Sequence, residues 1–581
     1  MTEPEEATPA FGRARSGERN SSFHHSYIVC TAVSLLFMPI IAILVPILYS
    51  HWSSLLPYAH LSLQRAKLGT VLNNPASFPE PPYVLFSSRV VLPDRFIQPA
   101  YIFINNQGSI AIVQQSPSWS LVWKTIVDVS PHVVMPGLID PHVHVNEPGR
   151  TSWEGFEYAS RAAAAGGTTT ILDMPLNNIP STLNHKTLAQ KINALASTKS
   201  YVDIGIIGGI TMPHVPFLTE LLDGGVLAFK SFMVDSQSKD FPNVSKKNLK
   251  EIIGALDRLS SEPGAVSKPI PYILHAELDL GPDEEDERNR RASDYNHRCY
   301  SDYEASRPSS WEVEAIRYAA DIANNSNVHI HIAHVSAFEA LELLREIRWG
   351  NRLKKAIVTA ETCPHYLMWA KEKIALGGTL FKCSPPIRSD DNRKLIVHQA
   401  FQDDASSRAI DLIASDHSPC PPELKTTDGN LTEAWGGISG LQYRLQATWT
   451  AAHAMNASLS RVAELLCEVP ARLFGIDNMK GFLKAGLDAD IVIWDPESSQ
   501  VLTEDKCHHR HKLSPYHGLK VRGIVLRTLL RGRSIYNSQG TSMHERVQFD
   551  ARLGKLLFRS SKTGLSRSIA PDEWKSAITR K

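Results

Sequence analysis

The 581-residue sequence has few cysteines and almost no net charge, and each scarcity excludes a class of protein. Its seven cysteines are scattered and include no CxxC pair, so we expect no disulfide framework and a body that folds in a reducing compartment. The 61 lysines and arginines nearly balance the 60 aspartates and glutamates, which argues against a nucleic-acid-binding protein. Hydrophobic residues make up 43% of the chain, enough to build a large core.

A single long apolar run stands near the N-terminus. Residues 28–48 carry no charged side chain, and none occurs between Arg19 and Arg65. A bilayer-spanning helix needs about 20 apolar residues, so the run is long enough to anchor the protein in a membrane. We therefore expect a polar segment over 1–26, a possible single-pass transmembrane helix over 27–50 and a linker over 51–82. The alternative is that this region is not part of the working protein.

Short apolar runs alternate with helical patterns along most of the chain. The runs predict strands over residues 133–139, 168–174, 203–210, 226–233, 271–278, 328–335, 356–362 and 410–415. Eight strands with helical spacers over about 280 residues match the number and size of a (β/α)8 barrel. A doubly wound sheet is the rival fold, but no GxGxxG follows the first strand.

Strand-like sequence also lies on both sides of this alternation. The stretches 83–91 and 101–107 precede it, and 489–494 and 522–536 follow it. We expect them to pair in a small β-sandwich domain built from residues 83–134 and 480–558. The α/β barrel then occupies 135–479, and residues 559–581 form a C-terminal tail.

Residues that can bind metals recur at the ends of the predicted strands, where a (β/α)8 barrel carries its active site. His142 and His144 are two positions apart and point the same way on an extended chain. His275 ends the fifth run, Asp416 follows the eighth, and Lys230 interrupts the apolar fourth run. Buried residues of these types are costly unless paired or bound to a metal. A shared divalent-metal site is the simplest account, and nitrogen ligands with one carboxylate suit zinc.

The sixth run offers several histidines for the same role. Strand alternation places His329 and His331 on one face and His334 on the other, and periodicity alone does not decide which face points inward. His365 and His417 lie close to the candidate ligands in sequence. We expect these two to orient ligands rather than to bind metal directly.

Six motifs together resemble the allantoinases of the amidohydrolase superfamily. They occupy residues 135–144, 146–155, 167–177, 361–367, 382–388 and 415–420. The resemblance extends from about residue 83 to about residue 558. It implies zinc-dependent hydrolysis of the cyclic amide bond of allantoin to allantoate, a step of purine catabolism. It also implies a cytoplasmic enzyme that is a homotetramer by analogy.

The resemblance assigns a role to each candidate residue. His142 and His144 would bind the first of two zinc ions, and His275 and His334 the second. Lys230, carbamylated by carbon dioxide, would bridge the two ions. Asp416 would bind the first ion and act as the general base. By motif position alone, the substrate contacts are expected to come from Asn177, Ser384 and Gly437.

Three positions test the choice of family member. Dihydroorotases usually carry an arginine where this chain has Asn146, and hydantoinases usually carry a tyrosine where it has Asp235. Many allantoinases have a glycine at Gln237. The alternatives are another cyclic amidase (a dihydropyrimidinase, hydantoinase or dihydroorotase) and a non-catalytic scaffold, although all six implied metal ligands are present.

Overall fold

The computed structural model describes residues 78–579, with gaps at 94, 117–124, 262–268, 281–295, 351–352, 403, 405–406, 426–427, 539–548, 550 and 562. The described residues all belong to one compact unit. The predicted polar segment, the apolar run and the linker up to residue 77 lie outside them. Among the described helices, none is long and apolar enough to cross a bilayer.

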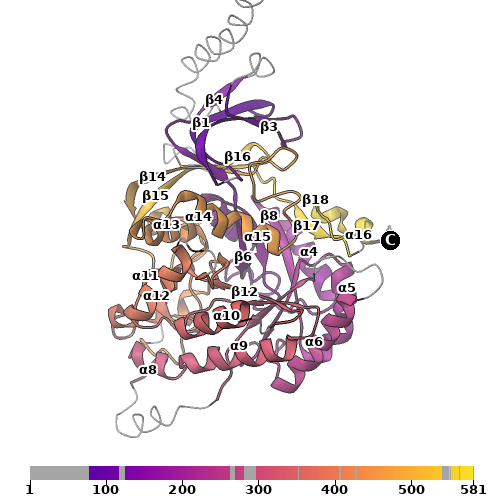
Figure 1. Ribbon diagram of the computed structural model, residues 1–581, viewed down its shortest axis with the longest axis vertical. Helices are drawn as coiled ribbons and strands as arrows, with labels where there is room; N and C mark the ends of the chain where they lie inside the picture. The colour runs from indigo at the N-terminus through magenta and orange to yellow at the C-terminus, as the bar shows by residue number, and fades with distance from the viewer. Residues whose placement is uncertain are drawn as a thin grey trace, which may run out of the picture. The chain divides into compact units, whose positions relative to one another are not determined.

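An eight-stranded sheet combines strands from both ends of the described chain (Figure 1). Its strands are β1 (Tyr83–Val91), β2 (Ile97–Ile104), β3 (Ile110–Gln114), β4 (Ile126–Asp128), β5 (Val133–Pro136), β14 (Ile491–Val501), β15 (Lys520–Leu530) and β16 (Arg533–Asn537). The junction between the two ends is the antiparallel pair β5 and β14. We expected a sandwich of two sheets, but these strands form one continuous sheet. A register shift between Ser87 and Val90 lets β1 pair first with β4 and then with β5.

A second sheet contains eight parallel strands that follow one another in chain order. They are β6 (Leu138–Val143), β7 (Thr168–Asp173), β8 (Asp203–Gly209), β9 (Ala228–Phe232), β10 (Pro271–His275), β11 (His329–Ile332), β12 (Ile357–Thr362) and β13 (Leu412–Ile413). The sheet is curled, because His417, just after β13, bridges in parallel to Val143 at the end of β6. The backbone N–H of His144 donates to the carbonyl of His417 at 2.8 Å.

Helices follow the parallel strands and cover the outside of the curled sheet (Figure 1). The longer ones are α3 (Phe156–Ala165), α4 (His185–Thr198), α6 (Lys246–Ser261), α9 (Ser309–Ala323), α10 (Phe338–Trp349), α12 (Asp390–Phe401) and α13 (Arg444–Ala454). The shorter ones are α5 (Leu218–Asp223), α8 (Tyr300–Ala305), α11 (Pro364–Met368), α14 (Leu459–Ala463) and α15 (Val469–Leu473). Helix α4 begins with a capping box between Asn184 and Thr187. Helix α6 buries Leu249, Ile252, Ile253 and Leu256, the spacing of one helix face.

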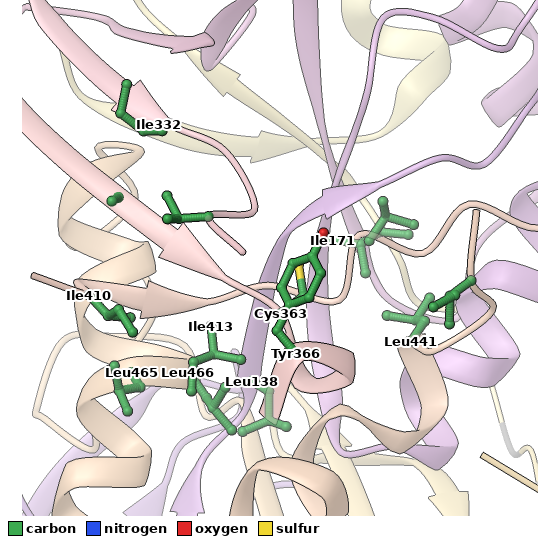
Figure 2. Packing of buried hydrophobic residues seen from close by; sticks show 14 of the residues in the cluster. Leu138, Ile171, Ile332, Cys363, Tyr366, Ile410, Ile413, Leu441, Leu465 and Leu466 are labelled. Carbon is green, nitrogen blue, oxygen red and sulfur yellow. The ribbon is translucent and has the colours of Figure 1, made fainter. Parts of the chain in front are cut away.

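The core is packed between the parallel strands and these helices. Figure 2 shows Cys363 and Tyr366 at its centre, with Leu465 and Leu466 on one side and Leu441 on the other. All five belong to one cluster of buried residues. Burial raises the pKa of the Cys363 thiol well above its usual value, so this thiol is a neutral, packed group rather than a nucleophile.

The run 133–139, expected to be one barrel strand, is divided between the two sheets. Residues Val133–Pro136 pair with β1 and β14, and the first parallel strand starts only at Leu138. Gly137 marks the junction. A Cβ atom there would lie 2.3 Å from the Thr169 hydroxyl oxygen, so only glycine lets the chain pass this close to β7.

The predicted C-terminal tail is instead folded structure. Strand β17 (Leu556–Arg559) pairs in parallel with the start of β8 and antiparallel with β18 (Ser566–Ile569). Helix α16 (Trp574–Thr579) follows. The Trp574 ring is 1% exposed, and its indole N–H donates to the Gly224 carbonyl at 2.8 Å. The segment is therefore held to the parallel sheet and its helices.

A buried ion cluster lies where the ends of the chain meet the parallel sheet. Lys480 Nζ lies 2.8 Å from Asp203, 3.0 Å from Asp488 and 2.6 Å from Asp490. Arg531, at the end of β15, lies 2.7 Å from the same Asp203. Three acidic side chains thus share two cations, which leaves no room there for a metal ion.

Candidate active site

The parallel strands bring the predicted metal ligands together at one end of the sheet. His142 lies within β6, Lys230 within β9, and His275 ends β10. His334 and Asp416 follow β11 and β13 directly. All of these side chains are buried, as is His144.

Distances confirm that these residues form one cluster. Nε2 of His142 lies 3.2 Å from the Asp416 carboxylate, and Nε2 of His144 lies 3.5 Å from it. The His334 ring is 5.4 Å from that of His142 and 4.5 Å from that of His275, centre to centre. The His142, His144 and Asp416 donor atoms lie close enough to hold one metal ion.

The charges in the cluster favour a bound cation. Burial alone would raise the pKa of Asp416, but His142 and His144 outweigh it and hold the pKa well below its usual value. Burial lowers the pKa of His334 and of His275, and the nearby Lys230 lowers both further. The site therefore presents a carboxylate and neutral imidazoles, which are the states that bind divalent metals.

Two buried polar atoms at the site lack hydrogen-bond partners in the described structure: Nζ of Lys230 and Nδ1 of His334. Lys230 is fully buried, and burial lowers its pKa to about 8. Unpartnered buried groups are uncommon and costly. A metal ion at His334 and an acidic group added to Lys230 would satisfy both, so the residues present fit a metal centre.

A carboxylate that the sequence analysis had given no role holds His142 in place. Glu361, at the end of β12, accepts a hydrogen bond from Nδ1 of His142 and leaves Nε2 facing Asp416. Its other oxygen lies 3.2 Å from Nε2 of His331. His331 is therefore a support for Glu361 and not a ligand, and His329 contacts the Thr359 hydroxyl at 2.9 Å. Of the three histidines in the run 328–335, only His334 faces the cluster.

His275 has a similar support on the other side of the site. Its Nε2 donates to Glu277 at 2.6 Å, which leaves Nδ1 for the cluster. Arg307 Nε donates to the other oxygen of Glu277 at 3.0 Å. Burial would raise the pKa of Glu277, but Arg307 and His275 outweigh it and lower the pKa to about 2. The signal that could have revealed both supports is a buried glutamate near a strand end.

A cavity opens above the cluster. Its wall contains the four histidines and Asp416, together with Leu176, Asn177, Phe232, Asp235, Ser236, Gln237, Arg307, Ser384, Ser418, Trp435 and Gly436. Asn177 and Ser384 thus lie where substrate contacts were expected. Asn177 Nδ2 also lies 3.1 Å from Nδ1 of His144. Gly437 does not line the cavity, because its N–H is engaged by the Lys382 carbonyl at 2.9 Å.

Four residues in the cavity wall have strained backbone. Asn177, Gln237, His334 and Asp416 have φ values of 70°, 58°, 36° and 43°. Residues with a Cβ rarely adopt positive φ, at a cost of about 1–2 kcal/mol per residue. Such strain is concentrated at functional sites, where it fixes side chains that the regular strand would aim elsewhere.

His365 and His417 are both fully buried beside the cluster, and neither ring has a hydrogen-bond partner within the described residues. His417 also faces a second histidine, His509, which lies between β14 and β15. Its ring lies 4.7 Å from that of His509, and its Nε2 lies 3.6 Å from Glu154. The segment around His509, which precedes β15 in the chain, therefore packs against His417, the residue after Asp416.

Comparison with known proteins agrees with this geometry. The pattern described as "Amidohydrolase family" matches residues 133–535. The chain belongs to the amidohydrolase family. Among its relatives in this family is an allantoinase of Arabidopsis thaliana, 38% identical over 80% of this chain and 90% of its own. An allantoinase of Saccharomyces cerevisiae is also 38% identical, over 72% of this chain and 86% of its own.

A solved amidohydrolase structure has the same fold. The L-hydantoinase (dihydropyrimidinase) of Arthrobacter aurescens superimposes with a TM-score of 0.71 at 27% identity, covering 82% of this chain and 99% of that one. The resemblance drawn from the six sequence motifs is thereby confirmed.

Proposed function

We propose that the protein hydrolyses the cyclic amide bond of allantoin to give allantoate. The observation that carries this proposal is the convergence of four histidines and Asp416 around a buried Lys230 whose amine has no hydrogen-bond partner among the described residues. The similarity to allantoinases over most of the chain supports the choice of ring. We interpret the curled parallel sheet, with its contact between β6 and the end of β13, as a (β/α)8 barrel.

The cofactor we propose is a pair of zinc ions bridged by carbamylated Lys230. His142, His144 and Asp416 would hold one ion, and His275 and His334 the other. When bound, the metals would polarise the ring carbonyl and lower the pKa of a water molecule to about 7. The Lys230 amine suits carbamylation, because a pKa of about 8 leaves part of it neutral near pH 7 and able to add to carbon dioxide.

The residues of the chain then supply binding and proton transfer. Asp416, a carboxylate at neutral pH, takes the proton of the attacking water and delivers it to the ring nitrogen that leaves. Glu361 and Glu277 keep the His142 and His275 rings in the orientation that the ligand role requires. Asn177 and Ser384 line the cavity and are proposed to hydrogen-bond the substrate.

The polar cavity wall suits the ureido arm that distinguishes allantoin from simple hydantoins. Asp235 and Gln237 both line it, where the sequence departs from hydantoinases and from many allantoinases. We further propose a cytoplasmic homotetramer, by analogy with related enzymes. A membrane anchor over residues 27–50 stays a prediction.

The test is ring opening by the full chain purified with zinc and bicarbonate. Allantoin, hydantoin, dihydrouracil and dihydroorotate are supplied separately, and metal content is measured on the same samples. We expect allantoin turnover that Asp416→Asn abolishes without loss of fold. Preferential turnover of another ring would contradict the proposed substrate, and a chain that folds but binds almost no metal would favour a scaffold role.

A further inference from the structure

Two buried lysines lie behind one wall of the cavity. Lys382 is 4% exposed and Lys425 is 6% exposed. Neither forms an ion pair with a carboxylate in the described part of the chain, and neither lines the cavity. Buried ammonium groups of this kind are rare without an acidic partner, so their contacts need an explanation.

Backbone carbonyls replace the missing carboxylates. Lys425 Nζ donates to the carbonyl oxygens of Thr379 at 3.0 Å, Trp435 at 2.8 Å and Lys382 at 3.4 Å. Lys382 Nζ donates to the carbonyls of Ala434 at 2.6 Å and Thr432 at 3.2 Å. The two ammonium groups therefore bind three of the four carbonyls of the segment 432–435, those of Thr432, Ala434 and Trp435.

The chain segment held in this way is the cavity wall itself. Trp435 and Gly436 line the cavity, and the Trp435 ring packs edge-on against Trp153 at 4.8 Å. The next residue, Gly437, donates its N–H to the carbonyl of Lys382, so the same lysine holds the segment by its backbone as well. The lysines thus fix the wall from behind and leave its inner face to the substrate.

Burying the two positive charges costs free energy, which indicates that the charges have a structural role. Burial lowers the pKa of both lysines to about 8. The nearby charges of Lys425 and Arg307 lower the pKa of Lys382 further, whereas the only charges that raise the pKa of Lys425 are those of the Cys420 and Cys383 thiols. An apolar side chain of similar length would fill the same space without that cost. An apolar side chain could not, however, donate hydrogen bonds that hold several mutually repelling carbonyl oxygens close together.

We propose that Lys382 and Lys425 are positioning residues that hold the Thr432–Gly437 segment in the shape that fits the substrate. They act on substrate fit through Trp435 and Gly436, and not on the metal centre. The inference rests on the proposed hydrolysis of a cyclic amide, because substrate fit is measured through that reaction.

The test compares Lys425→Met with the wild type in the full, zinc-loaded chain. We expect the KM for allantoin to rise about tenfold, the size of effect for a lost hydrogen bond to a charged group, while kcat and bound zinc change little. Lys371→Met is the matched control, because Lys371 pairs with Glu304 at 2.7 Å and should leave KM unchanged. A drop of kcat and zinc together in Lys425→Met would overturn the inference, as would an unchanged KM.

A double-mutant cycle tests the route through the wall. If Lys425 acts through Trp435, the KM effects of Lys425→Met and Trp435→Phe are not additive, and additive effects would contradict the proposal. Should Lys425→Met fail to fold, Lys382→Met decides by the same KM criterion. The wild type tests the proposed function separately. If it opens a different ring, the KM of each variant relative to wild type is measured with that ring. If it opens none of the rings, both proposals fail.

Discussion

Glu361→Gln is the most informative single change, because it removes one negative charge and preserves the size of the side chain. The Glu361 side chain is 1% exposed. Its carboxylate accepts hydrogen bonds from Nδ1 of His142, from Nε2 of His331 and, at 3.4 Å, from the backbone N–H of His334. Burial would raise its pKa, but His142 and His331 outweigh burial and hold it well below the usual value. The wild-type group is therefore a carboxylate that accepts from every neighbour.

A glutamine cannot serve the same neighbours. Its amide oxygen accepts from only one histidine, and its NH₂ group then faces the other as a donor. Loss of such a partner from a metal-binding histidine typically costs 10–100-fold in metal affinity, or about 1.4–2.8 kcal/mol. We expect the zinc affinity of Glu361→Gln to fall within this range, and activity to recover when zinc is added in excess.

The assay is zinc binding across a series of buffered free-zinc concentrations, with turnover measured on the same samples. Glu314→Gln is the control, since Glu314 is 45% exposed and forms an ion pair with Arg317 at 3.2 Å, away from the metal-binding residues. Zinc affinity and turnover of Glu361→Gln both within about threefold of wild type would refute the reasoning that this carboxylate tunes His142.

Three further predictions follow from the described contacts. Dialysis against a chelator should abolish turnover and lower the midpoint of thermal unfolding, and zinc with bicarbonate should restore both; a chelated protein with full activity would rule out the metal centre. Lys480→Met should lower the free energy of unfolding by about 3–5 kcal/mol in denaturant titrations, because it leaves Asp490 buried without its cation and Asp203 paired with Arg531 alone, while the exposed Lys394→Met should not move the midpoint. The KM of the wild type should rise as the pH passes about 8, where Lys382 and Lys425 lose their protons, and the rise should be smaller in Lys425→Arg, because the arginine stays charged and only Lys382 still titrates.

The metal cluster could be predicted from sequence because strand ends are visible in sequence. Each apolar run predicted a strand, and parallel strands place their carboxyl ends at one edge, so His142, His275 and Asp416 had to converge. The supports were harder to find. Glu361 on β12 reaches His331 because β12 pairs with β11, and it reaches His142 on β6, a strand far away in sequence; no local pattern encodes either contact.

The errors in the prediction have physical causes. Residues 133–139 look like one apolar strand, and only the close approach of Thr169 to Gly137 shows where the chain leaves one sheet for the other. The substrate contact expected of Gly437 stays a prediction: it follows the cavity-lining Gly436, and its N–H donates to Lys382, a contact between segments far apart in sequence. Residues 559–581 have no long periodic pattern, and the described residues of this region are held by packing of β17 against β8 and of Trp574 against Gly224.

The position of β17 has a consequence for how the chain is made. Its flanking residue Lys555 donates its N–H to Asp203, 352 positions earlier, and Arg531 binds the same carboxylate. The Asp203 carboxylate at the start of β8 therefore lacks these two partners until residues 531 and 555 have been synthesised. Contacts between such distant positions slow folding and leave strand edges exposed meanwhile. The protein is expected to depend on chaperones during synthesis and to lose solubility when it is shortened at its C-terminal end.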